Sequence, residues 1–204
     1  MALSREALTS VQAVKDYLRL SSGENDALLA TLIEAVSAHF AAYTGRNLTA
    51  RDYSPDPGSA DFDPDNAILD GSGYPEQLLP QYPVQNLASL SLDGVALPPA
   101  QAPGQAGWVL DRSAGVLSLL GGVFTRGRHN LAVTFRAGFE SPPADLAQAC
   151  LEQAATRFQE SGAAQGRLGV SARTLADGSV SYQGQALLPQ VTAVLDRYRN
   201  RSLL

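Results

Sequence analysis

Apolar residues recur at helical spacing through the first 49 residues of the chain. Val11, Val14 and Leu18 fall on one face and predict a short helix. A second, longer helix is expected between residues 23 and 45, where a wide apolar stripe is spaced 4-3-4-3. A stripe this wide is typical of burial against more than one neighbour, in the same chain or in another subunit. The stripe consists of Leu29, Ile33, Val36, Phe40 and Tyr43.

The middle of the chain changes first to a turn-rich texture and then to a period of two. Residues 50–82 are dominated by Pro, Gly and Asp, with six aspartates from Asp52 to Asp70. Within residues 83–138, apolar and polar positions alternate, as at 88–93 and 131–136, which predicts strands with one buried face. Short connections such as Asp93-Gly94 favour antiparallel pairing. We therefore expect four to six mostly antiparallel strands here.

A strand-to-helix corner follows the last of these strands. Gly138 can end the strand, and the helix is expected to begin at Pro143 and to reach about Gln159. Residues 161–185 are rich in Gly, Ala, Ser and Gln and predict a loose arm, with a weak hairpin around Asp177-Gly178. A terminal helix is expected from the 3-4-3 spacing of Leu188, Val191, Leu195 and Tyr198.

These elements predict an α+β fold, in which a helical body carries an inserted, mainly antiparallel β subdomain. The body comprises two N-terminal helices, a helix near 143–159 and a C-terminal helix. The expected boundaries are 1–49 for the N-terminal part of the body and 50–138 for the β insertion with its acidic loop. Residues 139–160 would complete the body, and 161–204 would form a flexible arm with the C-terminal helix.

Composition narrows the function classes. The chain has 204 residues, a formal net charge of −5 and a pI near 4.9, which argues against a general nucleic-acid-binding surface. A single cysteine, Cys150, excludes an internal disulfide and fits a reducing compartment. No signal peptide is expected, because the N-terminus lacks a basic stretch followed by an apolar run. No membrane span is expected either, because no stretch approaches about 18 uninterrupted apolar residues.

The aspartate run raises the question of a metal site. Asp61, Asp63 and Asp65 imitate the start of a calcium-binding loop. An EF-hand loop then needs Gly at its sixth position and a bidentate Glu at its twelfth, where this chain has Asn66 and Ser72. A solvated acidic loop is therefore favoured. The alternative is a calcium-type module or a metal-dependent enzyme built on the three aspartates.

Other catalytic chemistry has little basis in the sequence. His39 and His129 are far apart along the chain, no G-x-S-x-G stretch is present, and Cys150 lies among small apolar residues of a helix. We expect no enzyme activity and no cofactor. The basic C-terminal segment could contact phosphates, solvate a helix end or bind an acidic patch on a partner protein; its cations are Arg197, Arg199 and Arg201.

Four blocks of sequence, in order, resemble a known family. They are LTSVQAVKDYLRLSSGENDALLATLIEAVSAHFAAYTGRNL (8–48), YPVQNLASLSLDGVAL (82–97), VTFRAGFESPPADLAQA (133–149) and LPQVTAVLDRYRNR (188–201). Together they resemble the head–tail connector, or adaptor, proteins of tailed double-stranded-DNA bacteriophages. The acidic segment 52–82 and the arm 161–185 match that family poorly.

The resemblance implies a structural neck protein of the virion, assembled in the bacterial cytoplasm as a ring, typically of twelve subunits. Such a ring docks under the portal protein, extends the DNA channel and provides a platform for a stopper or tail-completion protein. DNA would pass through without sequence-specific binding, and no membrane is involved. The stripe of the long helix would then be a candidate subunit interface. The candidate portal- or neighbour-binding residues are Leu188, Val191, Leu195, Tyr198, Arg197, Arg199 and Arg201.

Overall fold

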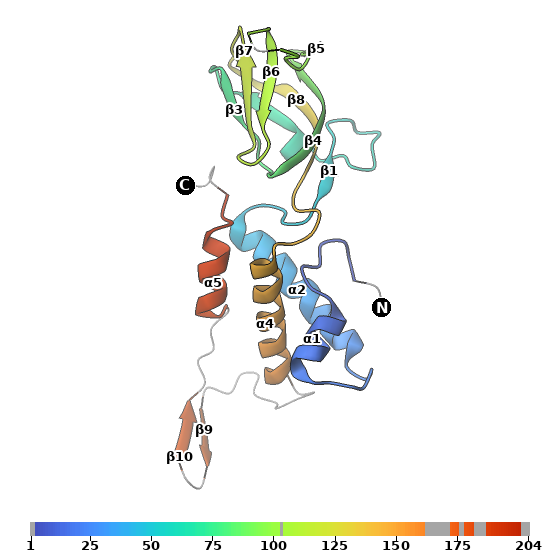
Figure 1. Cartoon of the computed structure of the whole chain (residues 1–204), viewed down its shortest axis with the longest axis vertical. Coiled ribbons are helices and arrows are strands. Elements are labelled where there is room, and N and C mark those ends of the chain that lie inside the picture. Colours follow the sequence, from blue (N-terminus) through green and yellow to red (C-terminus); the bar gives the residue numbers. More distant parts are fainter. Residues whose placement is uncertain (1–2, 103, 162–171, 176–177, 182–186, 201–204) are drawn as a thin grey trace. The chain divides into compact units, whose positions relative to one another are not determined.

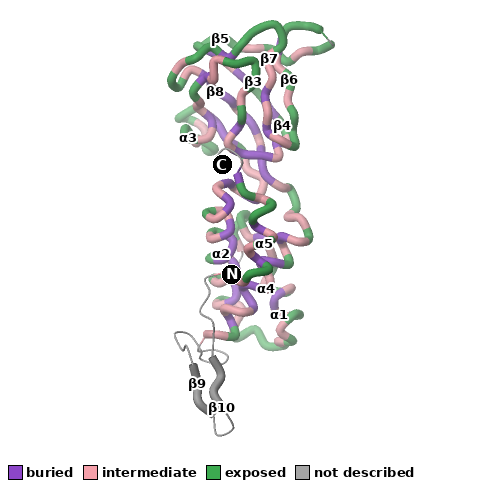
Figure 2. The backbone as a smooth tube through the Cα atoms, turned by 90° about the vertical axis from the view of Figure 1, so that its left-hand side faces the viewer, coloured by how far each residue is buried: buried purple, intermediate pink, exposed green. Residues whose placement is uncertain are grey.

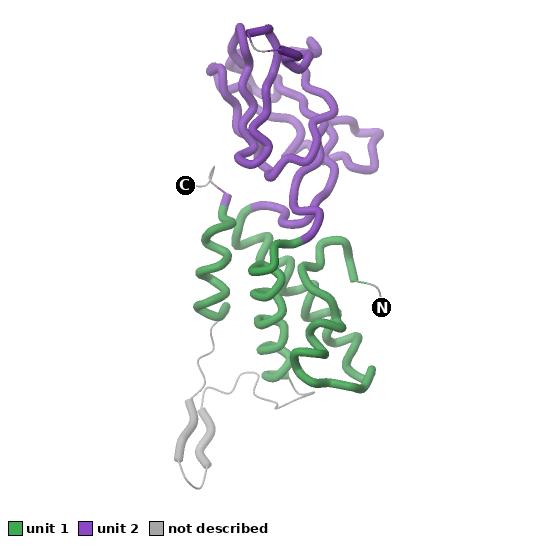
Figure 3. Tube along the Cα trace, viewed as in Figure 1, with its two compact units in different colours: residues 1–45, 142–199 green, residues 46–141, 200–204 purple. Residues whose placement is uncertain are grey.

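The computed structural model describes residues 3–102, 104–161, 172–175, 178–181 and 187–200. The chain divides into two compact units (Figure 3). Unit 1 comprises Met1–Gly45 and Pro142–Arg199, and unit 2 comprises Arg46–Ser141 and Asn200–Leu204. The α+β class expected from the sequence is confirmed, because helices dominate unit 1 and antiparallel strands dominate unit 2 (Figure 1).

Unit 1 is a helical body built around α4 (Ala144–Glu160). The helices α1 (Val11–Leu18), α2 (Asp26–Thr44) and α5 (Pro189–Asp196) all pack against α4 (Figure 1). Local chemistry sets several helix ends. The side chain of Ser10 caps α1, and Gly45 ends α2 in the left-handed conformation. The described part of the chain also contains the antiparallel hairpin β9 (Ala172–Leu175) and β10 (Gly178–Ser181).

The helix α2 is long and apolar enough, by length and composition alone, to cross a membrane. The helix is also a core element of unit 1, because it packs against α4 and its residues Leu29, Ile33, Val36 and Phe40 are buried (Figure 2). A core helix passes the same compositional test as a membrane span, and the packing of α2 accounts for its apolar character.

Unit 2 holds two antiparallel sheets around one core. The larger sheet contains β1 (Arg51–Tyr53), β8 (Gly127–Ala137), β4 (Val84–Leu92) and β5 (Val95–Ala96) in that order, and β2 (Ile68–Gly71) also pairs with β8. The smaller sheet has the order β3 (Glu76–Leu78), β7 (Val116–Leu120), β6 (Gly107–Asp111). The short helix α3 (Pro64–Ala67) precedes β2. The core between the sheets includes Tyr53, Leu117, Phe124, Leu131 and Phe135.

The register of β8 confirms the alternation predicted for residues 131–136, whereas that of β4 corrects the one predicted for 88–93. Leu131, Val133 and Phe135 are all buried. In β4 the register against β8 shifts between Leu87 and Ser89, so that Ala88 is an extra residue. Ala88 is therefore exposed, contrary to the expectation that it shares a buried face with Leu90.

The corner after β8 depends on a close backbone approach at Gly138. This glycine has φ +109°, and a Cβ built on it would lie 2.3 Å from the carbonyl oxygen of Thr49. Its N–H donates to the carbonyl of Pro83 at 2.9 Å. The next helix, α4, begins at Ala144, one residue later than expected, because Pro143 occupies the N-cap position.

Candidate interaction surfaces

The stripe predicted for the long helix lies in the core of unit 1. Four of its five residues, Leu29, Ile33, Val36 and Phe40, have no exposed surface. In the folded unit they offer nothing to a neighbouring subunit. Tyr43 is half-buried, and its hydroxyl donates a 2.7 Å hydrogen bond to Asp196. That hydrogen bond raises the pKa of Tyr43. The stripe thus packs mainly against helices of its own chain.

The C-terminal helix α5 is docked on α4 by the apolar residues predicted to bind a partner. Val191 and Leu195 are fully buried within unit 1. Leu188 precedes the helix and donates its backbone N–H to the Gln153 side chain at 2.9 Å. Because the buried stripe is used for docking, only the opposite, outer surface of α5 can meet another molecule.

Polar contacts fasten the end of α5 to the same body. Tyr198 donates a hydrogen bond to Asp145 at 2.7 Å, and Arg197 forms an ion pair with the same carboxylate at 3.0 Å. The Arg199 guanidinium lies 5.8 Å from the centre of the Tyr43 ring. Both Arg197 and Arg199 nevertheless keep exposed surface. Arg201, the third cation of the predicted cluster, lies outside the described residues.

A shallow groove runs along the junction of α4 and α5. Its volume is about 230 Å³. Its lining combines the carboxylates and amides of four residues with three apolar side chains. The lining residues are Asp145, Gln148, Ala149, Glu152, Gln190, Val191 and Val194. The groove therefore lies beside the outer surface of α5.

The acidic loop does not converge on a metal site. Asp63 is the N-cap of α3 and forms an ion pair with Arg51 at 3.3 Å, whereas Asp61 and Asp65 are exposed. Among the described residues, no group of three or more His, Cys, Asp or Glu side chains could hold a metal ion. The loop 54–63 is instead ordered by its own hydrogen bonds, including those from Ser54 N–H to the Asp61 carbonyl and from Gly58 N–H to the Asp56 side chain, both at 2.9 Å.

Two further reactive side chains, His39 and Cys150, are engaged in packing. His39 accepts a hydrogen bond at its Nδ1 from Arg157, at 3.2 Å. Cys150 is buried beside Ser37, and burial raises the pKa of its thiol to about 11. A thiol with a raised pKa is a poor nucleophile at neutral pH. Neither group has the surroundings of a catalytic residue.

An apolar surface that sequence analysis missed covers the outer face of the smaller sheet. The strand register places Leu78 on β3, Val116 and Leu120 on β7, and Val109 on β6 on one side, and these apolar residues define the outer face. The polar residues on the same side are Glu76, Ser118 and Asp111. Leu78, Val109 and Leu120 are 51%, 45% and 37% exposed. In the sequence, Val109 lies between Trp108 and Leu110, and Leu120 follows Leu119. Apolar and polar residues therefore do not alternate here, and the sequence did not show which side of the sheet is buried.

Comparison with known proteins assigns a family. The family described as "Head completion protein" matches residues 7–201. No curated protein matches the chain. A chain from the "Neck of native GTA particle computed with C12 symmetry" is 24% identical, with a TM-score of 0.57, and the match covers 98% of this chain and 92% of that one.

A second solved structure, the "Neck of empty GTA particle computed with C6 symmetry", gives 24% identity and a TM-score of 0.55, with coverage of 98% and 93%. A third, the "Virion of native gene transfer agent (GTA) particle", gives 22% identity and a TM-score of 0.53, with the same coverage. At this level of identity, the three likenesses establish a shared fold over almost the whole chain.

Proposed function

The chain belongs to the head completion protein family, and we propose that it is a structural adaptor in the neck of a tailed phage or phage-like particle. Copies of the chain assemble into a ring, typically of twelve, that docks under the portal and extends the DNA channel. The ring also provides a platform for a stopper or tail-completion protein. The observation that carries this proposal is the family match over residues 7–201. The shared fold with chains of a particle neck supports it.

The charge of the molecule is compatible with a DNA conduit. The chain carries a formal net charge of −5, so its copies repel the phosphate backbone rather than bind it. DNA would pass through the ring without sequence-specific contacts. The role is one of assembly geometry in the virion neck, and we propose no reaction chemistry for it.

The outer surface of α5 is our candidate for contact with the portal or with a neighbouring subunit. Its inner stripe is engaged with α4, which leaves Gln190, Ala193, Arg197 and Arg199 exposed. Deleting α5 would uncover apolar surface on α4 and would confuse loss of binding with loss of folding. Substitution on the outer surface avoids this difficulty.

The test is sedimentation velocity of the full chain, alone and mixed with its portal protein. We expect a ring of about twelve copies, either alone or only on the portal. Ala193→Glu should weaken portal binding, whereas Ala35→Glu, at an exposed position of α2, is the matched control and should leave binding unchanged. A chain that stays monomeric and does not bind the portal would refute the proposed function.

A further inference from the structure

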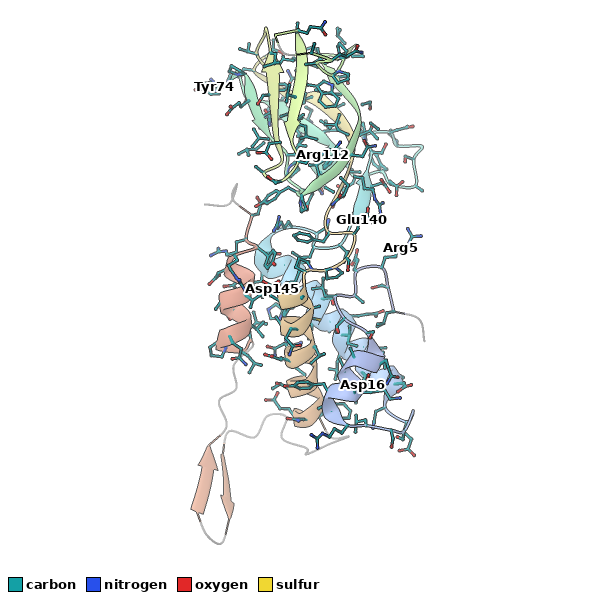
Figure 4. All side chains as sticks on the ribbon, viewed as in Figure 1. Arg5, Asp16, Tyr74, Arg112, Glu140 and Asp145 are labelled. Carbon is teal, nitrogen blue, oxygen red and sulfur yellow. The ribbon has the colours of Figure 1, made fainter. Side chains whose placement is uncertain are left out.

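Exposed apolar side chains concentrate on one surface of unit 2. Among the described residues, eight large hydrophobic side chains are exposed, and five of them lie on or beside the outer face defined above. Antiparallel sheets usually present polar residues on their open side, and large apolar patches mark interaction surfaces. The outer face therefore has the composition of an interface. The five side chains are Tyr74, which projects from the margin of unit 2 in Figure 4, Leu78, Val109, Leu120 and Val123.

A groove adjoins this face at the ends of β6 and β7. Its volume is about 230 Å³, and its lining is almost entirely apolar. An apolar cavity of about 150 Å³ holds a benzene ring, so the groove has room for one aromatic side chain. Leu120 belongs both to the groove and to the outer face. The lining residues are Leu97, Pro98, Ala106, Gly107, Leu119, Leu120, Gly121 and Gly122.

Two arginines border the outer face. Arg112 directly follows β6, at the end of the strand opposite to Gly107 of the groove. The Cβ of Arg126 lies 3.4 Å from the position that a Cβ on Gly73 would take, next to Tyr74. Both arginines are exposed, and neither forms an ion pair with any residue that the structure describes. The register also places the carboxylates of Glu76 and Asp111 on this side, and Asp111 accepts hydrogen bonds from Ser113 and Ala114 of its own turn. Apolar side chains bordered by these two arginines fit a partner with an apolar centre and carboxylates around it.

The acidic loop of the same unit combines an exposed apolar side chain with carboxylates on either side of it. Residues 52–70 contain six aspartates and neither Lys nor Arg. Phe62, between Asp61 and Asp63, is 42% exposed. The hydrogen bonds within the loop hold it in one conformation, which lowers the entropic cost of binding. In Figure 1 the loop after β1 lies on the opposite side of unit 2 from β3 and β7.

We propose that the acidic loop of one copy docks on the outer face of the next, with Phe62 in the apolar groove and Asp61 and Asp65 near Arg112 and Arg126. The inference deepens the proposed ring and rests on it. A contact between two different surfaces on opposite sides of one unit is head-to-tail, and head-to-tail contacts close into rings when the rotation permits. The occupant of the face is thus a second copy of this chain.

Reciprocal charge reversal tests this contact. R112E/R126E makes the face acidic, and D61R/D65R makes the loop basic. Each variant alone then places like charges together, so self-association in the presence of the portal should weaken by about tenfold or more. Mixing the two variants should restore assembly, because each loop now meets a face of opposite charge. Sedimentation velocity of the separate and mixed full-length variants measures both effects.

A matched pair of substitutions tests the apolar part of the contact. Phe62→Ser should weaken assembly, whereas Tyr17→Ser, which removes an aromatic ring that is 54% exposed in unit 1, should not. Thermal unfolding midpoints close to that of the wild type would show that the variants are folded.

The outcomes separate this inference from the proposed function. If the wild-type chain assembles but mixing the charge-reversed variants restores nothing, the loop-to-face contact is wrong and the ring adaptor stands. If the variants keep normal self-association but lose a different neck protein, the face belongs to that protein and the inference is again wrong. If the wild-type chain never assembles, with or without portal, both proposals are refuted.

Discussion

The backbone approach at Gly138 allows a quantitative prediction about how the corner after β8 is held. In Gly138→Ala, the new Cβ would lie 2.3 Å from the Thr49 oxygen and 2.5 Å from its carbonyl carbon. Both are backbone atoms and cannot rotate away. Backbone strain at φ +109° costs about 1–3 kcal/mol, relief of the overlap costs about 1–3 kcal/mol, and weakening of the bond to Pro83 costs about 1 kcal/mol. We expect a total loss of about 3–7 kcal/mol.

Gly94→Ala is the matched control. Gly94 also has a positive φ, +78°, but nothing lies within 4 Å of the position of its Cβ. Only the conformational penalty of about 1–2 kcal/mol should remain. The difference between the two variants therefore isolates the contact with Thr49 from the general cost of placing alanine at positive φ.

Urea unfolding followed by fluorescence measures this difference in unit 2. Trp108 is the only tryptophan of the chain, and its indole N–H donates to the Leu97 carbonyl at 3.0 Å, so its emission reports on unit 2. With an m-value of about 2 kcal/mol/M, Gly138→Ala should lower the midpoint by about 1.5–3.5 M and Gly94→Ala by about 0.5–1 M. Equal shifts would refute the close approach at the corner.

Four further predictions follow from the described contacts. Leu195→Ala should cost about 2–4 kcal/mol, because Leu195 is fully buried; thermal unfolding of the variant measures the loss, and an unchanged midpoint would contradict the docking of α5. Cys150, with its pKa raised to about 11, should resist a thiol reagent at pH 8 until urea unfolds the chain; rapid labelling of the native protein would contradict its burial. Asp63→Ala should lose about 1 kcal/mol of cap stability, equally with and without calcium in thermal unfolding; a loss confined to calcium-containing buffer would instead favour a metal site. Hydrogen bonds from Thr125 and Asn130 lower the pKa of Asp93 below 3.8. The stability that the Asp93 carboxylate contributes is therefore present above that pH and is lost as the pH falls through the folded-state pKa. Asp93→Asn should lose less stability than the wild type between pH 7 and pH 3 in urea unfolding, and an identical loss would contradict this assignment.

Long periodic segments could be predicted from the sequence because each carries its own signal. The helix α2 spans 19 residues and ends at Gly45, as expected, and β8 alternates over several positions. The resemblance to head–tail connectors is likewise confirmed by the family match over residues 7–201, since it depended on ordered blocks rather than on one motif.

Short strands could not be predicted in the same way. The strands β1, β2 and β3 have three or four residues each, too few to establish a period of two. Two of them form by pairing with β8, which is about 60 to 85 residues away in the sequence, as in the register of Arg51 with Ala137. Propensity within residues 50–82 favours turns, and only the tertiary pairing makes these segments strands.

The stripe of α2 and the outer face show a second limit, which concerns the interpretation of apolar patterns. A pattern identifies which side chains leave water, but it does not identify what covers them. The α2 stripe suggested a subunit interface, yet α4 of the same chain packs against that helix. The outer face gave no signal, because β6 and β7 carry apolar residues on both of their sides. Interfaces of this kind become visible only when the fold shows which apolar side chains remain uncovered.

Acidity poses a problem for any assembly of identical copies of this chain, because a net charge of −5 on each copy opposes their approach. The distribution of charge in unit 2 offers a physical solution. Six aspartates lie in residues 52–70, while Arg112 and Arg126, which form no ion pair with the residues that the structure describes, border the outer face of the same unit. In the contact that we propose, these charges would attract neighbouring copies to each other locally, although the net negative charge of the molecule opposes binding of DNA. A single acidic sequence could therefore meet both requirements of the proposed conduit, which are cohesion between subunits and low affinity for DNA.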